Sequence, residues 1–171
     1  MNLAHTISGA ESSKGNGREK DAADHDKSRN VHTPQQILRS ALDALSRGSF
    51  SEVLSYFDDR FKYNDHGLAL EFTEQPRLTE FFEKSLELFP GTRLEIVSLF
   101  EDRDHAIAEW KLSATQTVPY GSISYRSRIS FLGTTIVRVD KGRIVEWSDY
   151  YDQNSSRRIS LAAFFTEWIE Y

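Results

Sequence analysis

Asp149 is the residue with the strongest potential for chemistry in this sequence. On period-two spacing it shares one face of a strand with Trp147 and Tyr151. Aromatic walls exclude water from a carboxyl group and so raise its pKa, which lets it hold or accept a proton near neutral pH. Alternatively, Asp149 pairs with a basic neighbour such as Lys111 or Arg128.

A second candidate cluster is the run Tyr63-Asn64-Asp65-His66-Gly67. Histidine is the residue type suited to proton transfer near neutral pH, and His66 is placed to act beside Asp65, although a solvated turn histidine is more common. Asp-His-Gly is also ordinary turn chemistry, in which the carboxylate binds local backbone amides. Tyr63 on the preceding strand is either a hydrogen-bond donor to a substrate oxygen or a packed aromatic residue.

The segment from His105 to Thr115 carries two alternating sets of side chains. The apolar set is Ala106, Ala108, Trp110, Leu112 and Ala114, and the mostly polar set is Ile107, Glu109, Lys111 and Ser113. If the polar set faces a cavity, Glu109 and Lys111 join Asp149 in binding substrate, and the apolar set forms a homodimer through the sheet. In the opposite orientation Trp110 is in the core and Lys111 is in solvent. The pattern leaves both orientations open.

Other classes of chemistry lack their signatures. There is no cysteine, and no two histidines have the spacing of metal ligands. The sequence contains no glycine-rich phosphate loop, nucleophile elbow or dinucleotide fingerprint, so we expect no metal and no cofactor. A net charge of −5 with interspersed signs argues against nucleic acid. Without a signal peptide or a membrane-spanning apolar run, we expect a soluble cytoplasmic protein that does not bind membranes.

The elements that must position these residues begin after a polar tail. Residues 1–32 cannot bury enough apolar surface to order, so one domain is expected over 33–171. Thr33-Pro34-Gln35-Gln36 predicts a capped helix start, and Ser49-Phe50-Ser51-Glu52 predicts a second capping box for a short helix that extends to Phe57. Pro76 introduces a third helix, and Ser155 or Ser156 caps a last one.

Extended segments are expected between and after these helices. A short strand from Phe61 to Asp65 and an extended piece from Leu68 to Phe72 precede the third helix. Four longer strands follow, with turns that include Val118-Pro119-Tyr120-Gly121, and they predict an antiparallel meander. An α+β fold results, in which a curved, mainly antiparallel sheet carries its helices on one face.

Two stretches of this sequence resemble a known superfamily. Ala44 to Ser49, followed by Tyr56 to Phe61 and Tyr63 to Gly67, resembles the opening of ketosteroid isomerases and SnoaL-like proteins. The closing stretch from Asp140 to Asp152 resembles the last two strands of SnoaL-like cyclases and limonene-epoxide hydrolase. The resemblance to this nuclear-transport-factor-2-like superfamily implies a conical, half-open barrel with an apolar pocket between sheet and helices.

The resemblance also implies roles for individual residues. Asp149 occupies the place of an acid/base aspartate, and Asp65 that of the general base of ketosteroid isomerases. The oxyanion-binding residues of those isomerases correspond to Ala41 and, within about a residue, Thr135, so steroid isomerisation is not expected. Glu109 and Lys111 exchange the charges of the hydrolase pair, so that mechanism is not expected either.

These observations lead to two hypotheses about function. The first is a cofactor-free isomerase, cyclase, dehydratase or hydrolase acting on a small apolar ring, polyketide-like or terpenoid-like molecule. Its catalytic residues are Asp149 and Asp65, and Lys111, Tyr63, His66, Glu109, Trp147 and Tyr151 bind the substrate. The second is a non-catalytic module that binds a small ligand or a protein and dimerises through Trp110 and Leu112.

Overall fold

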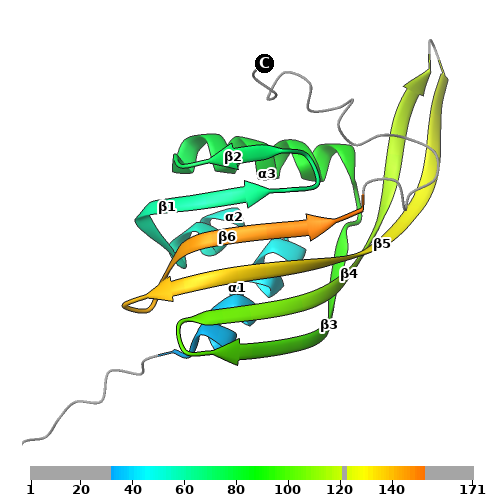
Figure 1. Cartoon of the computed structure of the whole chain (residues 1–171). Coiled ribbons are helices and arrows are strands. Elements are labelled where there is room, and N and C mark those ends of the chain that lie inside the picture. The colour runs from blue at the N-terminus through cyan, green and yellow to red at the C-terminus, as the bar shows by residue number, and fades with distance from the viewer. Residues whose placement is uncertain (1–31, 121–122, 153–171) are drawn as a thin grey trace, which may run out of the picture.

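The computed structural model describes residues 32–120 and 123–152 (Figure 1). Its elements in chain order are α1 (Pro34–Ser46), α2 (Phe50–Ser55), β1 (Phe57–Asp65), β2 (Leu70–Phe72), α3 (Gln75–Leu88), β3 (Arg93–Asp102), β4 (His105–Tyr120), β5 (Ile123–Asp140) and β6 (Arg143–Tyr151). The polar tail up to residue 31 and the helix expected after Ser155 lie outside the described residues. None of the helices in the described ranges is long and apolar enough to cross a membrane.

Helix α1 starts as the sequence predicts. The Thr33 hydroxyl accepts a hydrogen bond from the Gln36 backbone, and the Gln36 side chain accepts one from the Thr33 backbone. This reciprocal capping satisfies two amide groups that have no partner inside the helix. The second predicted capping box is wrong, because the Ser49 side chain makes no capping hydrogen bond, and Glu52 instead pairs with Arg47 at 3.0 Å.

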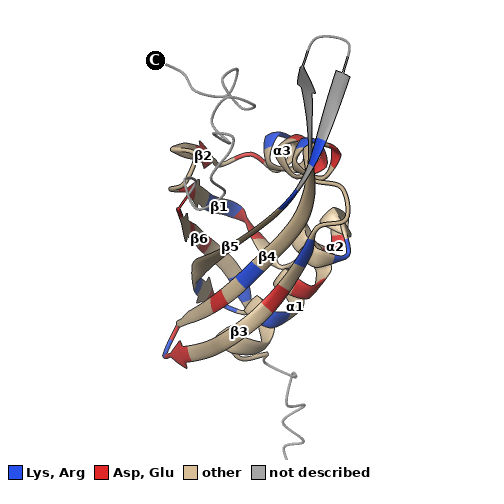
Figure 2. Ribbon diagram, turned by 90° about the vertical axis from the view of Figure 1, so that its right-hand side faces the viewer, with Lys and Arg blue, Asp and Glu red and all other residues tan. Residues whose placement is uncertain are grey.

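The sheet has six strands in the order β2-β1-β6-β5-β4-β3. Strands β3 to β6 form the predicted antiparallel meander, whereas β1 pairs parallel with β6. Figures 1 and 2 show that α1, α2 and α3 all lie on one side of this curved, unclosed sheet. The α+β prediction is confirmed, and the parallel pair joins segments from the two ends of the described chain.

Two local predictions are wrong. Phe57 begins β1 instead of ending the second helix, and it packs on Trp147 with ring centroids 5.7 Å apart. Val118, Pro119 and Tyr120 continue β4, because pairing with β5 extends to Tyr120 and leaves two residues for the connection. In both places pairing or packing with a distant segment outweighs the local turn or helix signal.

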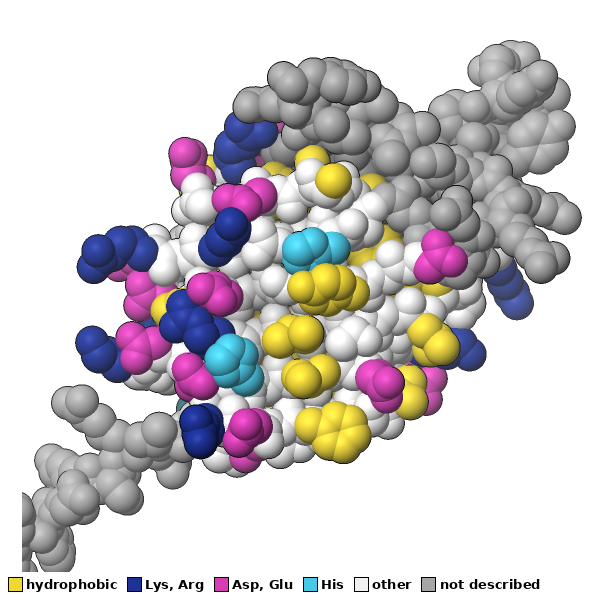
Figure 3. All heavy atoms as spheres, in the orientation of Figure 1, with side chains coloured by type: hydrophobic (Ala, Val, Ile, Leu, Met, Phe, Trp, Pro, Cys, Tyr) yellow, Lys and Arg dark blue, Asp and Glu magenta, His cyan; other side chains and the backbone are white. Residues whose placement is uncertain are grey.

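The orientation of β4 settles which of its two faces is internal. Trp110 is buried among the core residues, whereas Lys111 and Glu109 are exposed on the opposite face of the sheet. That outer face carries large exposed apolar side chains, which are spread from β6 to the edge strand β3 in Figure 3. These outer-face residues are Val97, Phe100, Ile107, Leu132 and Tyr150.

Candidate active site

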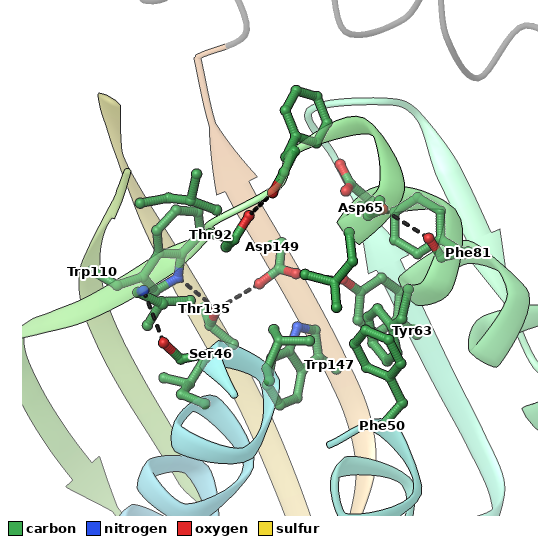
Figure 4. A pocket seen from close by; sticks show the side chains of 18 of the residues that line it. Ser46, Phe50, Tyr63, Asp65, Phe81, Thr92, Trp110, Thr135, Trp147 and Asp149 are labelled. Carbon is green, nitrogen blue, oxygen red and sulfur yellow. Dashed lines mark hydrogen bonds between the residues drawn. The ribbon is translucent and has the colours of Figure 1, made fainter. Parts of the chain in front are cut away.

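A cavity of about 140 Å³ lies between the helices and the inner face of the sheet (Figure 4). Its wall is mostly aromatic and aliphatic, and its polar members are Ser46, Ser85, Thr92, Thr135, Tyr63, Asp65 and Asp149. An engineered cavity of roughly 150 Å³ holds one benzene molecule. The enclosed part of this pocket therefore fits a single small ring.

Asp149 lies in this apolar wall with only 7% of its surface exposed. Its Oδ2 accepts a hydrogen bond from the Tyr63 hydroxyl at 2.6 Å, and its Oδ1 accepts one from the Thr135 hydroxyl at 2.5 Å. Burial raises the pKa of the Asp149 carboxyl, and these two donors lower it in part. Neither Lys111 nor Arg128 provides these contacts, since both of the oxygens are bound by hydroxyl groups.

Asp65 also lines the cavity and is 4% exposed. Its carboxylate accepts a hydrogen bond from the Leu68 backbone N–H at 2.8 Å. The Tyr151 hydroxyl also donates to this carboxylate and lies 2.9 Å from each of its two oxygens. Burial, followed by the charge of Asp149, raises the pKa of Asp65 to about 7. The turn chemistry considered from the sequence is therefore present, but it holds a carboxyl group that faces the pocket.

The two carboxyl groups are neighbours because of the parallel strand pair. Asp65 on β1 and Asp149 on β6 are register partners, and both side chains line the same cavity. Burial raises the pKa of both carboxyls and the charge of Asp149 raises the pKa of Asp65 further, so the two titrate as a coupled pair. Such a pair contains a proton donor and a proton acceptor at once.

Thr135 and Trp110 are parts of the site that sequence reasoning did not assign to it. Thr135 on β5 is the cross-strand partner of Asp149, and the indole N–H of Trp110 donates to its hydroxyl at 2.8 Å. Their signal in the sequence is weak, because only the pairing of β4, β5 and β6 brings them together. Thr135 is fully buried.

The other residues predicted for the site divide into two groups. Tyr63 and Trp147 line the cavity, and Tyr151 lies beside it and contacts Asp65. Lys111 and Glu109 are exposed on the outer face, where Glu109 accepts a hydrogen bond from Ser98.

His66 is also exposed, and its ring stacks on Tyr150 with centroids 4.3 Å apart. The expectation that His66, Glu109 and Lys111 bind substrate in the pocket is therefore corrected. For Glu109 and Lys111 the physical reason is that Trp110 and its apolar neighbours on β4 occupy the inner face, whereas His66 lies in the exposed turn that follows β1. Within residues 32–120 and 123–152, no group of three or more His, Asp or Glu side chains is arranged to hold a metal ion.

A comparison of the sequence with profiles of known protein families identifies the family of this chain. The profile described as a SnoaL-like domain matches residues 38–147, which is more than half of the chain. The chain belongs to the SnoaL-like domain family. The matched range contains Asp65, Trp110 and Thr135 and stops two residues before Asp149. A search of curated proteins finds no match.

Solved structures with the same fold are similar to this SnoaL-like domain at low sequence identity. A protein with a ketosteroid isomerase-like fold from Catenulispora acidiphila, in complex with trimethylamine, is 16% identical with a TM-score of 0.63, covering 81% of this chain and 100% of its own. A candidate SnoaL-like polyketide cyclase from Shewanella denitrificans is also 16% identical, with a TM-score of 0.63. The match covers 76% of this chain and 97% of the cyclase chain. At this identity the similarity shows the fold alone.

The SnoaL-like domain described here has its own set of polar groups. Ala41, which the resemblance matches to one oxyanion-binding residue of the ketosteroid isomerases, is a fully buried α1 residue. Thr135, near the place matched to the other, is hydrogen-bonded to Asp149. The polar chemistry of this pocket is therefore concentrated on Asp149, Asp65 and the hydroxyls around them.

Proposed function

We propose that this protein is a cofactor-free acid/base enzyme that moves a proton on a small, neutral, apolar ring or polyketide-like or terpenoid-like molecule. The observation that carries the proposal is the pair of adjacent buried carboxyls, Asp65 and Asp149, in the wall of a ring-sized apolar cavity. A general base works best when its pKa is near the working pH, and burial moves carboxyl groups in that direction.

The step common to isomerases, cyclases and dehydratases of carbonyl compounds is removal of a proton beside the carbonyl group. In the proposed step, the Asp149 carboxylate takes this proton, and the electron pair of the C–H bond becomes a carbon–carbon double bond. The carbonyl oxygen receives the negative charge and takes the proton held by Asp65, which gives a neutral enol. In a substrate with a carbon–carbon double bond next to the carbon that lost the proton, this enol is a dienol. Asp149 then returns the proton to the far end of that double bond while Asp65 recovers its own from the enol oxygen, which completes an isomerisation.

The pocket lining favours an uncharged substrate. No lysine or arginine is among the described residues that line the cavity, so a carboxylate or phosphate on the substrate would be buried without a partner. Burying an unpaired charge is costly, whereas an apolar ring gains from contact with side chains such as Phe81, Phe82 and Trp147. A neutral molecule with one oxygen near the carboxyl pair satisfies both conditions.

The test is exchange of the α-hydrogens of cyclohexanone in D₂O, followed by proton NMR with and without the protein. Exchange reports proton removal regardless of which later step the natural substrate undergoes. We expect the wild-type protein to accelerate exchange above buffer and Asp149→Asn to lose roughly 100-fold or more of that acceleration. Asp104→Asn, which removes an exposed carboxylate outside the pocket, is the matched control and should retain it.

The alternative function is a non-catalytic module that binds a small ligand. It is favoured by the exposure of Lys111 and Glu109, which leaves the pocket without the cation and carboxylate expected to assist Asp149. Native mass spectrometry of wild type and Asp149→Asn distinguishes the two proposals when it is combined with the exchange assay. A co-purified apolar ligand without cyclohexanone exchange would favour binding over catalysis.

We also propose that the protein forms a homodimer through the outer face of the sheet. The support is the row of exposed apolar residues on that face, among which Leu132 is 68% exposed. Contiguous apolar surface of this kind marks an association site, and a two-fold axis lets one patch cover its own copy. Trp110 and Leu112, through which the sequence predicted the dimer, are not available for this contact, because both lie on the inner face and line the cavity.

A further inference from the structure

A chain of two hydrogen bonds connects Trp110 to the proposed base. The Trp110 Nε1–H group donates to Thr135 Oγ1 at 2.8 Å, and Thr135 Oγ1 lies 2.5 Å from Asp149 Oδ1. Figure 4 shows this chain as two consecutive dashed lines that end on Asp149. Trp110 and Thr135 are 4% and 0% exposed, so both groups are shielded from bulk solvent.

The donor properties of tryptophan fix the direction of this chain. An indole N–H can only donate, so the Thr135 hydroxyl must accept from Trp110. A hydroxyl has a single hydrogen, and with the indole held on one side that hydrogen is left to point at Asp149. Without Trp110 the Thr135 hydroxyl would be free to rotate and to accept a hydrogen bond from a protonated Asp149 instead.

The position of the Trp110 ring is fixed by its surroundings. Gly133, the cross-strand partner of Trp110, has no side chain, and a Cβ atom there would lie 2.2 Å from the ring. The ring also packs edge-on against the Phe131 ring, with ring centroids 6.0 Å apart, and its centroid lies 6.2 Å from that of the Tyr151 ring. These contacts hold the ring and so favour one direction for its N–H.

We propose that Trp110 is a positioning residue that acts through Thr135 to keep Asp149 as the ionised base, and so leaves the shared proton of the pair on Asp65. The proposal rests on the proposed acid/base function and assigns separate roles to the two carboxyls. Asp149 then receives two hydroxyl donors, from Thr135 and Tyr63, both of which favour its charged form. Hydrogen bonds to a charged group are the stronger class.

The ionisable groups near Asp149 agree with this division. Asp65 on β1 is the acidic neighbour, and the charge of Asp149 raises its pKa. Tyr63 on β1 and Tyr151 on β6 have pKa values raised by burial and by both carboxylates, so they remain neutral donors. The nearby His66 lowers the pKa of Asp149 when it is protonated, which also favours the carboxylate.

The indole of Trp147 is a second donor close to Asp149, but it is not part of this chain. It lowers the pKa of Asp149, yet among the described residues its N–H makes no hydrogen bond of normal geometry. Trp147→Phe therefore does not interrupt the route through Thr135. The variants that do interrupt it are Trp110→Phe, which keeps an aromatic ring, and Thr135→Val, which keeps the shape of the side chain.

The experiment follows the side-chain carboxyl ¹³C signals of Asp149 and Asp65 by NMR while the pH is varied. We expect Trp110→Phe to move the Asp149 titration to higher pH, and Thr135→Val to move it further. Thr135→Ser, which retains the hydroxyl, should restore the wild-type titration. Thr134→Val, which removes the neighbouring hydroxyl on the outer face of the sheet, should leave the Asp149 titration in place.

A double variant makes the route itself testable. Because Trp110 acts through Thr135, adding Trp110→Phe to Thr135→Val should cause no further change in the Asp149 titration. An equal change in both backgrounds, or an Asp149 titration that Trp110→Phe leaves unmoved, would overturn the proposal.

The exchange assay gives a separate answer about the reaction. Cyclohexanone exchange at pH 7 should fall about tenfold in Trp110→Phe, the rate equivalent of one lost hydrogen bond. If wild-type protein shows no exchange, the proposed function fails, while the NMR titration still decides whether Trp110 controls Asp149.

Discussion

Replacing Asp65 by asparagine should change how the stability of the protein depends on pH. Asparagine has nearly the same shape, and its carbonyl oxygen can still accept from the Leu68 backbone or the Tyr151 hydroxyl. It cannot ionise, so the substitution removes only the cost of placing a charge in an apolar wall beside Asp149. The effect is therefore separable from loss of packing.

The magnitude follows from the pKa of Asp65. Its ordinary value is 3.8 and its value in the fold is about 7, a rise of about 3. The folded state therefore keeps a proton that the unfolded chain has lost, so the stability contributed by this group is complete below pH 4 and is lost as pH rises through 7. At about 1.4 kcal/mol per pKa unit, wild type should lose about 4 kcal/mol from this residue between pH 4 and pH 8.

Urea unfolding at several pH values between 4 and 8, monitored by circular dichroism, measures this loss. Relative to wild type, Asp65→Asn should gain about 2–4 kcal/mol in unfolding free energy over that range, because structural relaxation reduces the full value. Asp104→Asn provides the contrast, since Asp104 is exposed and its pKa is lowered by His105. A constant difference between wild type and Asp65→Asn at every pH would refute the reasoning.

Two further substitutions test the packing around the site and the outer face. Gly133→Ala should destabilise the fold by about 1–3 kcal/mol, because the added carbon displaces the Trp110 ring. The indole N–H signal of Trp110 in NMR should shift as well. Thr134→Ala, at the next position, should cause neither change. Leu132→Glu should convert the proposed dimer to a monomer in light-scattering measurements without loss of helical circular dichroism; a dimer that persists would exclude this face.

The sequence predicted the α+β fold and the position of Asp149 on the last described strand. Asp149 and Trp147 occupy alternate positions in a strand that ends the matched pattern, and Thr33 with Gln36 defines the first helix, so local signals identify them. The role of Asp65 was ambiguous in the sequence, because an Asp-His-Gly run is compatible both with a turn and with a functional site. In the structure the Asp65 carboxylate both accepts a hydrogen bond within the turn and lines the cavity.

The orientation of β4 was not decidable from its residues, because both alternate sets contain apolar members. Only the helices packed on the inner face decide that Trp110 is internal and that Lys111 is exposed. The link from Trp110 to Asp149 depends on the registers of two strand pairs, and registers between distant segments are not visible in local periodicity.

The parallel pairing of β1 with β6 has a consequence for folding. Asp65 and Asp149 are 84 positions apart, and they meet only when the first strand closes onto the last one. Closing so long a segment is entropically costly and slow compared with forming the β4–β5 hairpin. Under the proposed acid/base function, a chain that has made its helices and its meander would still be inactive. The appearance of proton-transfer activity during refolding would then mark the moment at which the sheet is complete.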